Sequence, residues 1–593
     1  MRGFSFSRLH NLPVFDIMNI ITNENSLNDS VTQGMTCEVR AMNVHRAELL
    51  KGHDCYIAAL LERQITDEAD PRYGGFWTDS FHVEPRQSGF FLGDMMAAFC
   101  TEDSRWYLDP RLADAIRADL TYMENHQRPD GCFDLTPCNY ASPPDTAFMM
   151  NAVLSGWWLL EKCRAPEADF MRQRVYRLID STSRGIAAGG FHTPNHRWAI
   201  AACLLSCEKI TGNPVLRSRA MEYLREGLDI NEDGEFAERS AGNYNQVNDD
   251  QMIRLYLATG DQVYLEAAAK NLEMMYCYFD PDNSVFTNNS TRQDLGKKVY
   301  AESYYILYLL VGYLLHRPDL GAMAEWIWQD CSRRGVVPGG VEWVLLFPEM
   351  DGYGADGPFI KPFEYIDRLF PASDIARIRA GKWSCSLLKG KPNCLYFQHG
   401  AFSMYMTIYS NLCDRRNFLA DSLIPTSKGY RMKAHAAGWY YLPFPEKPDT
   451  SDWWAMDNPN KRPKTEGLPL DTILDIVKRP DGVDLHIKTD GIDQLPLRME
   501  FSFLPGGYIR TEHFLQRAKA GESINIIDGT VEACGPGGEC ITIGPAFSEH
   551  DFTDRMGGAY PLSDKHYTVY FTAYTPVEKV IRIRAGRKDR HLV

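Results

Sequence analysis

The sequence predicts an α+β multidomain protein in which an N-terminal (α/α) toroid precedes an antiparallel β-sandwich. Its 593 residues exceed what one hydrophobic core normally serves. Apolar residues recur at helical spacing from about residue 40 to 335, whereas short β-branched segments follow residue 390. We therefore expect four parts: an N-terminal extension at 1–39, the toroid at 40–335, a connecting region at 336–390 and the β-sheet domain at 391–593.

Helical periodicity covers eight segments of the toroid region, each with apolar residues at i, i+3, i+4 and i+7. They are Ala47–Arg63, Leu112–Asn125, Ala147–Lys162, Trp198–Ile210, Val215–Leu228, Met252–Ala258, Val263–Cys277 and Ala301–His316. A turn residue followed by phenylalanine recurs between them, roughly 45–58 residues apart, at Phe76, Phe133, Phe191, Phe236 and Phe286. This spacing matches two helices with their loops and so indicates repeated helical hairpins. Such hairpins would close into an (α/α)6 toroid; an open helical solenoid is the alternative.

Seven short segments of the C-terminal region combine β-branched residues with partial alternation. They are Asp471–Val477, Val483–Lys488, Leu497–Leu504, Tyr508–Gln516, Ser523–Val531, Glu539–Ile543 and Tyr567–Thr575. Turn pairs such as Asp481-Gly482 and Gly506-Gly507 separate them. Regular spacing of this kind is typical of an antiparallel sandwich. The region before it is rich in Gly, Pro and aromatic residues and is expected to bridge the two domains.

The overall charge narrows the range of partners. Lys and Arg number 63 against 78 Asp and Glu, and the net charge of −15 argues against nucleic acid or an anionic membrane surface. There is no uninterrupted apolar run of eighteen or more residues, so we expect no membrane span. A small, neutral or lightly charged ligand suits this surface, and a homo-oligomer remains open. No signal peptide is visible, from which we expect a cytoplasmic protein.

The fifteen cysteines have neither the paired spacing of a zinc site nor the density of a disulfide scaffold. Their scatter suits a reducing compartment. No set of His, Cys and Asp residues shows the spacing of metal ligands either. We therefore expect no metal and no other cofactor.

The first polar cluster lies where a turn enters a helix, at Asn195, His196, Arg197 and Trp198. Backbone N–H groups and the helix dipole favour an anion at such a position. His196 and Arg197 would add to that preference and make a pocket for a carboxylate. The structural alternative is that Asn195 only caps the helix and that Arg197 only faces solvent.

A second polar cluster occupies a loop between two predicted helices. Loops held by a rigid scaffold often carry function. Its candidate residues are Glu238, Arg239, Asn243, Tyr244, Asp249 and Asp250. The two aspartates have a structural alternative, because acidic residues are favoured in the first turn of a helix. Glu238 and Tyr244 have no such explanation, so we expect them to serve function.

Two further candidates come from elsewhere in the chain. A double proline presents Asp145 at a helix start, where a capping role is the alternative. His399 lies at the edge of the β-domain, although a lone histidine is more often structural. Trp77 and Trp198 stand near the turns and could stack on sugar rings, but most aromatic residues belong to the core.

Together these clusters resemble carbohydrate-active enzymes that combine a toroid with a β-sandwich. In heparinase II/III-like polysaccharide lyases an Asn-His pair heads one toroid helix, as Asn195-His196 does here. A segment of the type Asp-Gly-x-Phe-x-Glu-x-Ser-x-x-x-Tyr follows it, and residues 233–244 match that segment. A sandwich histidine completes the lyase site. His399 falls at about that position, but the longer His-rich signature of the lyases is missing.

Two segments look more like glycoside hydrolase family 154, whose known activity is β-glucuronidase. They are Ser142-Pro143-Pro144-Asp145 and Asn195-His196-Arg197-Trp198. Lyase substrates are polyanions, whereas this chain is strongly acidic. The resemblance therefore predicts a hydrolase that removes a β-linked glucuronic acid from an oligosaccharide or other glucuronide. The alternative is a polysaccharide lyase that acts by β-elimination, and a non-catalytic glycan-binding protein is the third hypothesis.

The hydrolase hypothesis assigns a role to each candidate residue. Glu238 and Asp145 form the acid/base pair, since hydrolysis needs two carboxyl groups across the glycosidic bond. His196, Arg197 and Arg239 hold the uronate carboxylate, and Tyr244 and His399 orient the sugar. The other predicted substrate-binding residues are Asn195, Asn243, Asp249, Asp250, Trp77 and Trp198. In the lyase alternative, Tyr244 or a histidine acts as base and acid.

Overall fold

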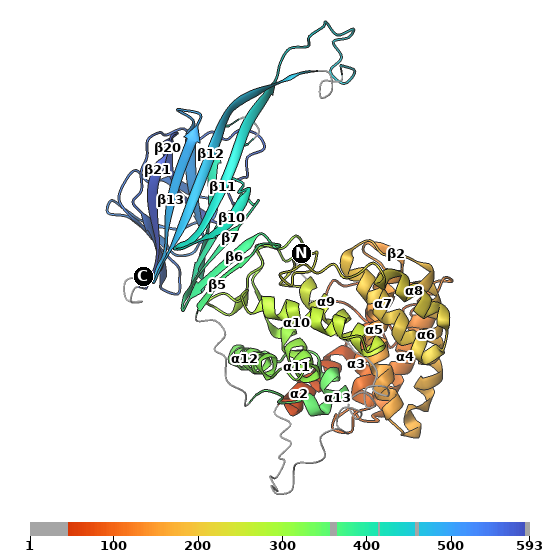
Figure 1. Cartoon of the computed structure of the whole chain (residues 1–593). Coiled ribbons are helices and arrows are strands. Elements are labelled where there is room, and N and C mark those ends of the chain that lie inside the picture. The colour runs from red at the N-terminus through yellow and green to blue at the C-terminus, as the bar shows by residue number, and fades with distance from the viewer. Residues whose placement is uncertain (1–44, 356–364, 413–414, 457–461, 588–593) are drawn as a thin grey trace, which may run out of the picture. The chain divides into compact units, whose positions relative to one another are not determined.

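The computed structural model describes residues 45–355, 365–412, 415–456 and 462–587, and it divides into two compact units (Figure 1). The helical unit runs to Met275 and resumes at Ser290, and the β unit holds residues 276–289 and the chain beyond Pro362. The fold class predicted from the sequence is confirmed. The expected N-terminal extension at 1–39 lies outside the described residues.

Twelve α-helices are described in the helical unit. They are α2 (Arg46–Leu61), α3 (Pro85–Phe99), α4 (Pro110–His126), α5 (Pro143–Lys162), α6 (Asp169–Ala188), α7 (Pro194–Thr211), α8 (Pro214–Leu224), α9 (Tyr244–Thr259), α10 (Gln262–Met275), α11 (Tyr305–Leu314), α12 (Pro318–Arg334) and α13 (Val341–Leu346). Short 3-10 turns lie at Pro166–Ala168, Glu302–Tyr304 and Pro348–Met350. Prolines in the first turn and left-handed glycines at the ends explain several of these boundaries.

The helices form an inner and an outer layer. α3, α5, α7, α9 and α11 pack on one another in that order, and each also packs against the helix that follows it in sequence. The inner helices are buried on nearly every side, whereas α4, α6 and α12 alternate buried and polar faces. α3 has no polar face to create a helical period, which is why no sequence pattern predicted it. A Cβ at its Gly93 would lie 2.4 Å from the carbonyl oxygen of Ala152, so glycine permits the close contact with α5.

The phenylalanine turns hold the loops between helices. Phe76 and Phe236 each form an antiparallel bridge with an upstream residue, and Phe133 begins a small hairpin of β1 (Phe133–Leu135) and β2 (Asn139–Ser142). These three side chains are buried, whereas Phe191 is 42% exposed. Phe76, Phe133 and Phe236 therefore anchor loops of the helical unit in its core, whereas the buried Phe286 belongs to the β unit, where its ring meets that of Tyr396.

The β unit is a sandwich of two large sheets. One sheet runs β10-β11-β12-β13-β21-β19-β18-β15-β16 and the other runs β17-β20-β14-β9-β8-β7-β6-β5, with one parallel pair, β17 with β20. The first sheet comprises β10 (Ser422–Thr426), β11 (Gly429–Tyr441), β12 (Lys464–Arg479), β13 (Gly482–Gly491), β15 (Tyr508–Arg510), β16 (Leu515–Arg517), β18 (Val531–Cys534), β19 (Glu539–Gly544) and β21 (Glu578–Arg587). The second comprises β5 (Tyr365–Phe370), β6 (Ile375–Ala380), β7 (Trp383–Leu388), β8 (Leu395–His399), β9 (Phe402–Ser410), β14 (Pro496–Phe503), β17 (Ser523–Asn525) and β20 (Tyr567–Tyr574). Two further short strands are β3 (Ser284–Val285) and β4 (Val299–Tyr300).

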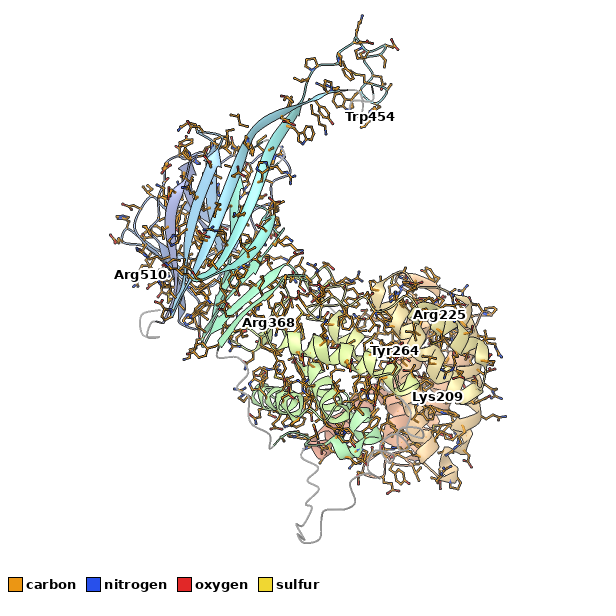
Figure 2. The ribbon with its side chains drawn as sticks, viewed as in Figure 1. Lys209, Arg225, Tyr264, Arg368, Trp454 and Arg510 are labelled. Carbon is orange, nitrogen blue, oxygen red and sulfur yellow. A yellow bond between two sulfur atoms is a disulfide. The ribbon has the colours of Figure 1, made fainter. Side chains whose placement is uncertain are left out.

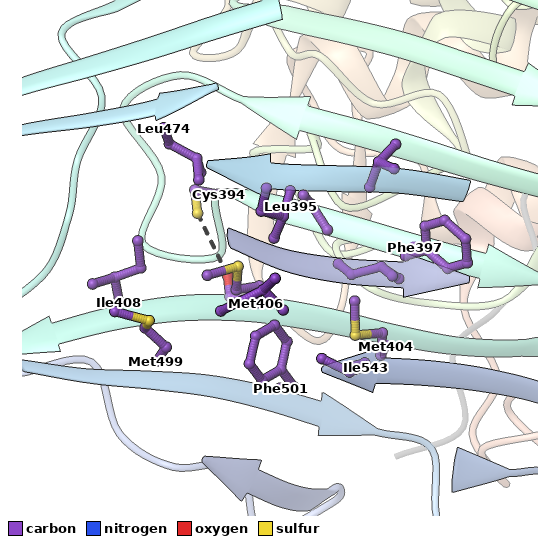
Figure 3. Close-up of a cluster of buried hydrophobic side chains, with 14 of the residues drawn as sticks. Cys394, Leu395, Phe397, Met404, Met406, Ile408, Leu474, Met499, Phe501 and Ile543 are labelled. Carbon is purple, nitrogen blue, oxygen red and sulfur yellow. Dashed lines mark hydrogen bonds between the residues drawn. The ribbon is translucent and has the colours of Figure 1, made fainter. Parts of the chain in front are cut away.

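The inward-facing residues of both sheets share one hydrophobic core. Figure 3 shows part of it, with Leu474 and Ile543 from one sheet beside Met406, Met499 and Phe501 from the other. Alternate residues of each strand reach this core, which is the period that the sequence displayed.

Three details differ from the sequence-based expectation. The second sheet begins at Tyr365, inside the region that was expected to be a connector at 336–390. The predicted strand Tyr508–Gln516 is divided by a turn into β15 and β16. Cys534 and Cys540, which face each other on β18 and β19, form a disulfide that the sequence spacing did not reveal. Within the described residues, no helix combines the length and apolar character needed to span a membrane.

Candidate active site

A cavity of about 290 Å³ opens among the N-terminal ends of α5, α7 and α9 in the helical unit. Three of the four sequence-predicted clusters contribute to its lining. The predicted residues that line it are Asp145, Asn195, His196, Asn243, Tyr244 and Asp250. Residues that the sequence did not single out complete the wall, among them Arg86, His192, Gln251, Arg254 and Arg292. Helix N-termini therefore bring together groups that are up to 200 residues apart in the chain.

Asn195 and Glu238 form the buried link between two of the predicted clusters. Asn195 is the second residue of α7, and its Nδ2 donates a hydrogen bond to Glu238. Asn248 donates to the other carboxylate oxygen at 3.1 Å. The helix cap is Thr193, so Asn195 is not the capping residue that the structural alternative proposed. Burial raises the pKa of Glu238, which does not itself line the cavity.

A second network fixes the turn before Tyr244. Asp294 accepts hydrogen bonds from Ser240 Oγ at 2.8 Å and from the backbone N–H of Gly242 at 2.9 Å. It also accepts one from Ser290 Oγ at 2.5 Å, and Ser240 Oγ in turn accepts one from the N–H of Tyr244. This buried carboxylate therefore joins the loop before α9 to the loop that carries Arg292.

Tyr244 and Arg292 meet at the cavity wall. The Arg292 guanidinium lies 4.8 Å from the centroid of the Tyr244 ring. Within the described part of the chain, neither the Tyr244 hydroxyl nor the Arg292 guanidinium has a hydrogen-bond or ion-pair partner. The pair is thus a phenol beside an uncommitted positive charge, both open to a ligand.

His196 contributes a neutral imidazole. Its ring meets that of His192 edge to face at 4.5 Å and lies 5.9 Å from the Phe148 ring. Burial lowers the pKa of His196 to about 4, helped by the positive charges of His192, Arg292 and Arg86. The ring is therefore uncharged at neutral pH, and it cannot attract a carboxylate electrostatically as the sequence interpretation assumed.

In the part of the cavity wall formed by α3 and α5, Asp145 is bound by three groups. Arg86 Nε lies 3.3 Å from its Oδ1, while Ser142 Oγ and Asn139 Nδ2 donate to its Oδ2 at 2.6 and 2.9 Å. Ser142 also caps α5 by accepting from the N–H of Asp145. The capping side chain of α5 is therefore that of Ser142 rather than that of Asp145, and Asp145 lines the cavity.

Asp249 and Asp250 lie in the second turn of α9, because the helix begins at Tyr244 rather than near Met252. The first-turn explanation for these acids is therefore wrong. Asp250 accepts hydrogen bonds from Arg254 at 2.6 Å and Gln251 at 2.7 Å, and burial raises its pKa to about 6. Asp249 is fully buried and does not line the cavity. Burial and the neighbouring Asp250 charge raise the pKa of Asp249 well above its usual range.

Besides Glu238, Asp249 and His399, four more predicted residues do not line the cavity. Arg197 stacks on Trp198 at 3.9 Å and donates to the Gly227 carbonyl, and Arg239 lies 3.7 Å from Glu235. Trp198 is fully buried and donates to Asp229, and Trp77 lies under Arg72 instead. Positions i and i+2 of a helix are about 200° apart, so Asn195 and Arg197 cannot face the same hollow. As carboxylate-binding candidates, Arg197 and Arg239 are replaced by Arg292.

A sequence signal for Arg292 did exist. Arg292 follows Phe286 by six residues. Glu238 and Tyr244 likewise follow Phe236 closely, by two and eight residues. Equivalent loops of a repeat tend to reach the same end of the fold. The polar segment after the last phenylalanine turn was therefore a candidate on position alone.

His399 belongs to the β unit, where it ends β8. Its Nδ1 lies 3.0 Å from the Cys540 carbonyl oxygen, and its side chain is buried. The neighbouring Gln398 donates to Asp282 at 3.0 Å within the same unit. These contacts give His399 a structural role in the sandwich, and its predicted role in orienting a sugar stays a prediction.

The cavity thus contains both polar groups that are paired with other side chains and polar groups that are not. Its two carboxylates, Asp145 and Asp250, are each paired with an arginine, while Tyr244 and Arg292 are available to a ligand. A larger hollow of about 790 Å³ near α2 and α4 contains none of the predicted residues. Among the described residues, no group of three or more His, Cys, Asp or Glu side chains could hold a metal ion.

Comparison with known proteins gives results for structure alone. No protein-family model and no curated protein matches the sequence. A xanthan lyase from Paenibacillus superposes with a TM-score of 0.56 at 10% identity, over 97% of this chain and 60% of the lyase, so the chain spans less than two thirds of that protein. A chondroitin AC lyase from Streptomyces coelicolor A3, solved in complex with chondroitin sulphate, gives 0.53 at 12% identity, over 98% and 84% of the two chains.

Heparinase III gives a TM-score of 0.51 at 11% identity, over 94% of this chain and 88% of that one. These structures support the resemblance to polysaccharide lyases, and they do not bear on glycoside hydrolase family 154. At such identities the similarity establishes the fold alone: the chain has the architecture of these lyases, a helical toroid followed by antiparallel β-sheets.

Proposed function

We propose that this protein is a polysaccharide lyase that cleaves a uronic-acid-containing glycan by β-elimination, with Tyr244 as base and acid. The observation that carries the proposal is the pairing of Tyr244 with Arg292 in one cavity with Asn195. The proposal adopts the alternative of the sequence analysis rather than its main hypothesis. The lyases that share the fold agree with it.

Elimination makes three demands on the site. The proton at C5 of the uronate must leave, the C4–C5 double bond must form, and the C4–O bond must break as the leaving oxygen gains a proton. The negative charge that develops on the carboxylate in this process has to be stabilised. A base and an acid near C5 and O4 are sufficient for the rest.

Arg292 and Asn195 suit the task of carboxylate stabilisation. The Arg292 guanidinium has no carboxylate partner among the described residues and can bind one from the substrate. Glu238 holds Asn195 by one amide hydrogen, which leaves the second available to the substrate. Glu238 and Asn248 therefore act as positioning residues that fix the amide toward the cavity.

Tyr244 can perform both proton transfers. As the base, its side-chain oxygen takes the C5 proton; as the acid, it then returns that proton to the leaving oxygen. The turn pinned by Asp294 holds the ring in place during both steps. His196 is neutral at neutral pH and adds no competing positive charge.

The hydrolase hypothesis is less well supported by the same cavity. Its proposed acid/base pair was Glu238 and Asp145, but Glu238 does not line the cavity and both of its oxygens accept amide hydrogen bonds. Asp145 is bound by Arg86, Ser142 and Asn139. An inverting or retaining hydrolase needs one free carboxylic acid and one free carboxylate facing the sugar.

The product distinguishes the two reactions. The purified protein is incubated with uronic-acid polysaccharides, such as chondroitin sulphate, xanthan and unsulfated glucuronans, and the ultraviolet absorbance is followed. Elimination yields a conjugated C4–C5 double bond and a new absorbance, whereas hydrolysis yields new reducing ends without it. Reducing ends without absorbance would overturn the lyase proposal.

Two variants provide the matched comparison. Tyr244→Phe removes the proposed base, and Glu238→Gln keeps the size of the side chain that positions Asn195. For a lyase, the first variant should lose far more activity than the second. The reverse order would support the hydrolase.

A further inference from the structure

Two strands of the β unit continue beyond their sheet as a ribbon, which we call the arm (residues 437–456 and 462–469; Figure 1). β10 pairs with β11 only as far as Lys433, and β13 pairs with β12 only from Leu470. Within the described chain, the ladder from Ala437–Pro469 to Tyr441–Lys464 therefore joins the two strands only to each other. A two-stranded hairpin by itself is marginally stable in water.

The arm exposes large apolar side chains and has no core. Gly438 is its one fully buried residue among those described. Figure 2 shows Trp454 near the far end of the arm, where 89% of its surface is exposed. The other exposed apolar side chains are Tyr440 at 71%, Leu468 at 65%, Trp453 at 60% and Leu442 at 44%. Monomeric proteins rarely leave such a group of apolar residues in contact with water, so a partner surface is indicated.

Part of the arm is ordered by contacts between rings and cations. Trp439 and Tyr441 meet edge to face at 5.2 Å, and Lys464 Nζ lies 3.8 Å from the Trp439 ring centroid. Arg462 lies over the rings of Tyr441 and Phe444. These contacts give the arm a defined shape before any partner binds, which lowers the entropy cost of association.

The charge of the arm excludes one class of partner and favours another. Residues 437–469 contain five acidic and four basic residues, a net charge of −1, whereas the whole chain carries −15. A polyanionic glycan would require an excess of positive charge, which the arm lacks. Two copies of this acidic chain repel each other over most of their surfaces, and the nearly neutral arm is a place where they can meet.

The composition and area of the exposed group also match an interface between proteins. Leucines 442 and 468 offer no flat face to a sugar ring, whereas Trp and Tyr are enriched at protein interfaces. The five exposed side chains offer roughly 600 Å² of apolar surface, since one aromatic residue buries about 150–250 Å². Two such surfaces in contact bury roughly 1,200 Å², the lower limit of a standard interface.

We propose that the arm is a self-association surface through which two copies of this chain pair about a two-fold axis. The same apolar group then faces itself, as a two-fold interface requires. Pairing buries Trp453 and Trp454 and gives the hairpin the third and fourth strands or side-chain layer that it lacks alone. This inference is independent of the chemistry proposed for the cavity.

The test is the mass of the full chain in solution, measured by sedimentation velocity over a range of micromolar concentrations. We expect twice the chain mass of 67.5 kDa for the wild type. The triple variant Trp453→Ser/Trp454→Ser/Leu468→Ser should sediment as a monomer, with a dissociation constant raised about 100-fold or more. A wild type that stays monomeric, or a triple variant that stays dimeric, would overturn the proposal.

A matched control removes exposed apolar surface elsewhere in the β unit. Leu515 and Ile527 are 63% and 72% exposed and lie outside the arm, so Leu515→Ser/Ile527→Ser should remain dimeric. A shortened variant replaces residues 440–465 with Asn-Gly, which removes the tip and leaves the sheet intact; it should also be monomeric with an unchanged unfolding temperature. Retention of the wild type on an immobilised polysaccharide, lost with the arm and without any dimer, would establish a glycan site instead.

Discussion

The two sides of the cavity are both built from helix N-termini, yet they treat their polar groups in opposite ways. On the α3–α5 side, Arg86 and Asp145 pair with each other, and Ser142 and Asn139 complete the contacts of the aspartate. On the α7–α9 side, Tyr244 and Arg292 face the cavity without a described partner. Polar groups that already form hydrogen bonds or ion pairs with each other define the shape of a site. Polar groups without such partners are the ones that can bind a substrate.

The pairing with Asp145 explains how Arg86 can occupy the first turn of α3. A helix N-terminus disfavours positive charge, and Arg86 is nearly buried there. The Asp145 carboxylate compensates for both penalties. No such compensation is built around Arg292 by the described residues, which is consistent with a role in binding an anionic ligand.

The largest expected effect comes from a change of Tyr244, on the α7–α9 side of the cavity. Tyr244→Phe should lower kcat by about 10³-fold, since a positioned acid/base group contributes about 10²–10⁴. The unfolding temperature should not change, because the hydroxyl has no hydrogen bond to lose in the described structure. Double-bond absorbance and a thermal melt measure the two quantities. A variant that retains a tenth of the activity would show that Tyr244 is not the base.

The next largest effect comes from a change of Asp145, on the α3–α5 side of the cavity. Asp145→Asn leaves Arg86 without its buried counter-charge and should cost about 2–3 kcal/mol of stability. Activity per folded molecule should stay within tenfold of the wild type, because Asp145 shapes the wall. As a control, Asp114→Asn removes a surface carboxylate 3.9 Å from Arg117 and should change neither quantity. Abolished activity in a stable Asp145→Asn protein would restore the hydrolase hypothesis.

A smaller effect separates the two neighbouring aspartates of α9. The folded-state pKa of Asp249 is raised above its unfolded value, so its contribution to stability is lost as pH rises above about 4. Asp249→Asn should therefore increase stability at pH 8, with little change at pH 4. Asp250→Asn is the contrast and should destabilise the protein, because Arg254 loses a 2.6 Å partner. Thermal melts at both pH values measure the difference.

The smallest effect concerns His196. Its folded-state pKa of about 4 lies below the usual 6.5, so the unfolded chain gains a proton before the folded one does as pH falls. The wild type should lose stability between pH 6.5 and 4, and His196→Gln should lose less over that range. The exposed His435, changed to Gln, is the matched control. Equal acid sensitivity of the His196→Gln variant and the wild type would show that His196 is not buried as a neutral ring.

Much of the site could be predicted from sequence because its residues are clustered at turns. Asn195, Glu238 and Tyr244 stand in short polar segments that break the apolar period, and the fold joins them through a direct hydrogen bond and a shared cavity. Arg197 and Arg239 do not line the cavity, for a local reason. Each is close in sequence to a residue that does, and neighbouring positions on a helix or turn point in different directions.

The sequence by itself determined the order of a helical toroid and a β-sandwich, because hydrophobic periods of 3.6 and 2 are local properties of the chain. It also indicated three of the polar turns whose residues line the cavity. Only the tertiary structure decided that Arg292 rather than Arg197 meets Tyr244, that Asp145 is paired with Arg86, and that Asp249 is buried. Whether a charged group is free or committed depends on partners from distant segments, and packing alone brings those partners within hydrogen-bond distance.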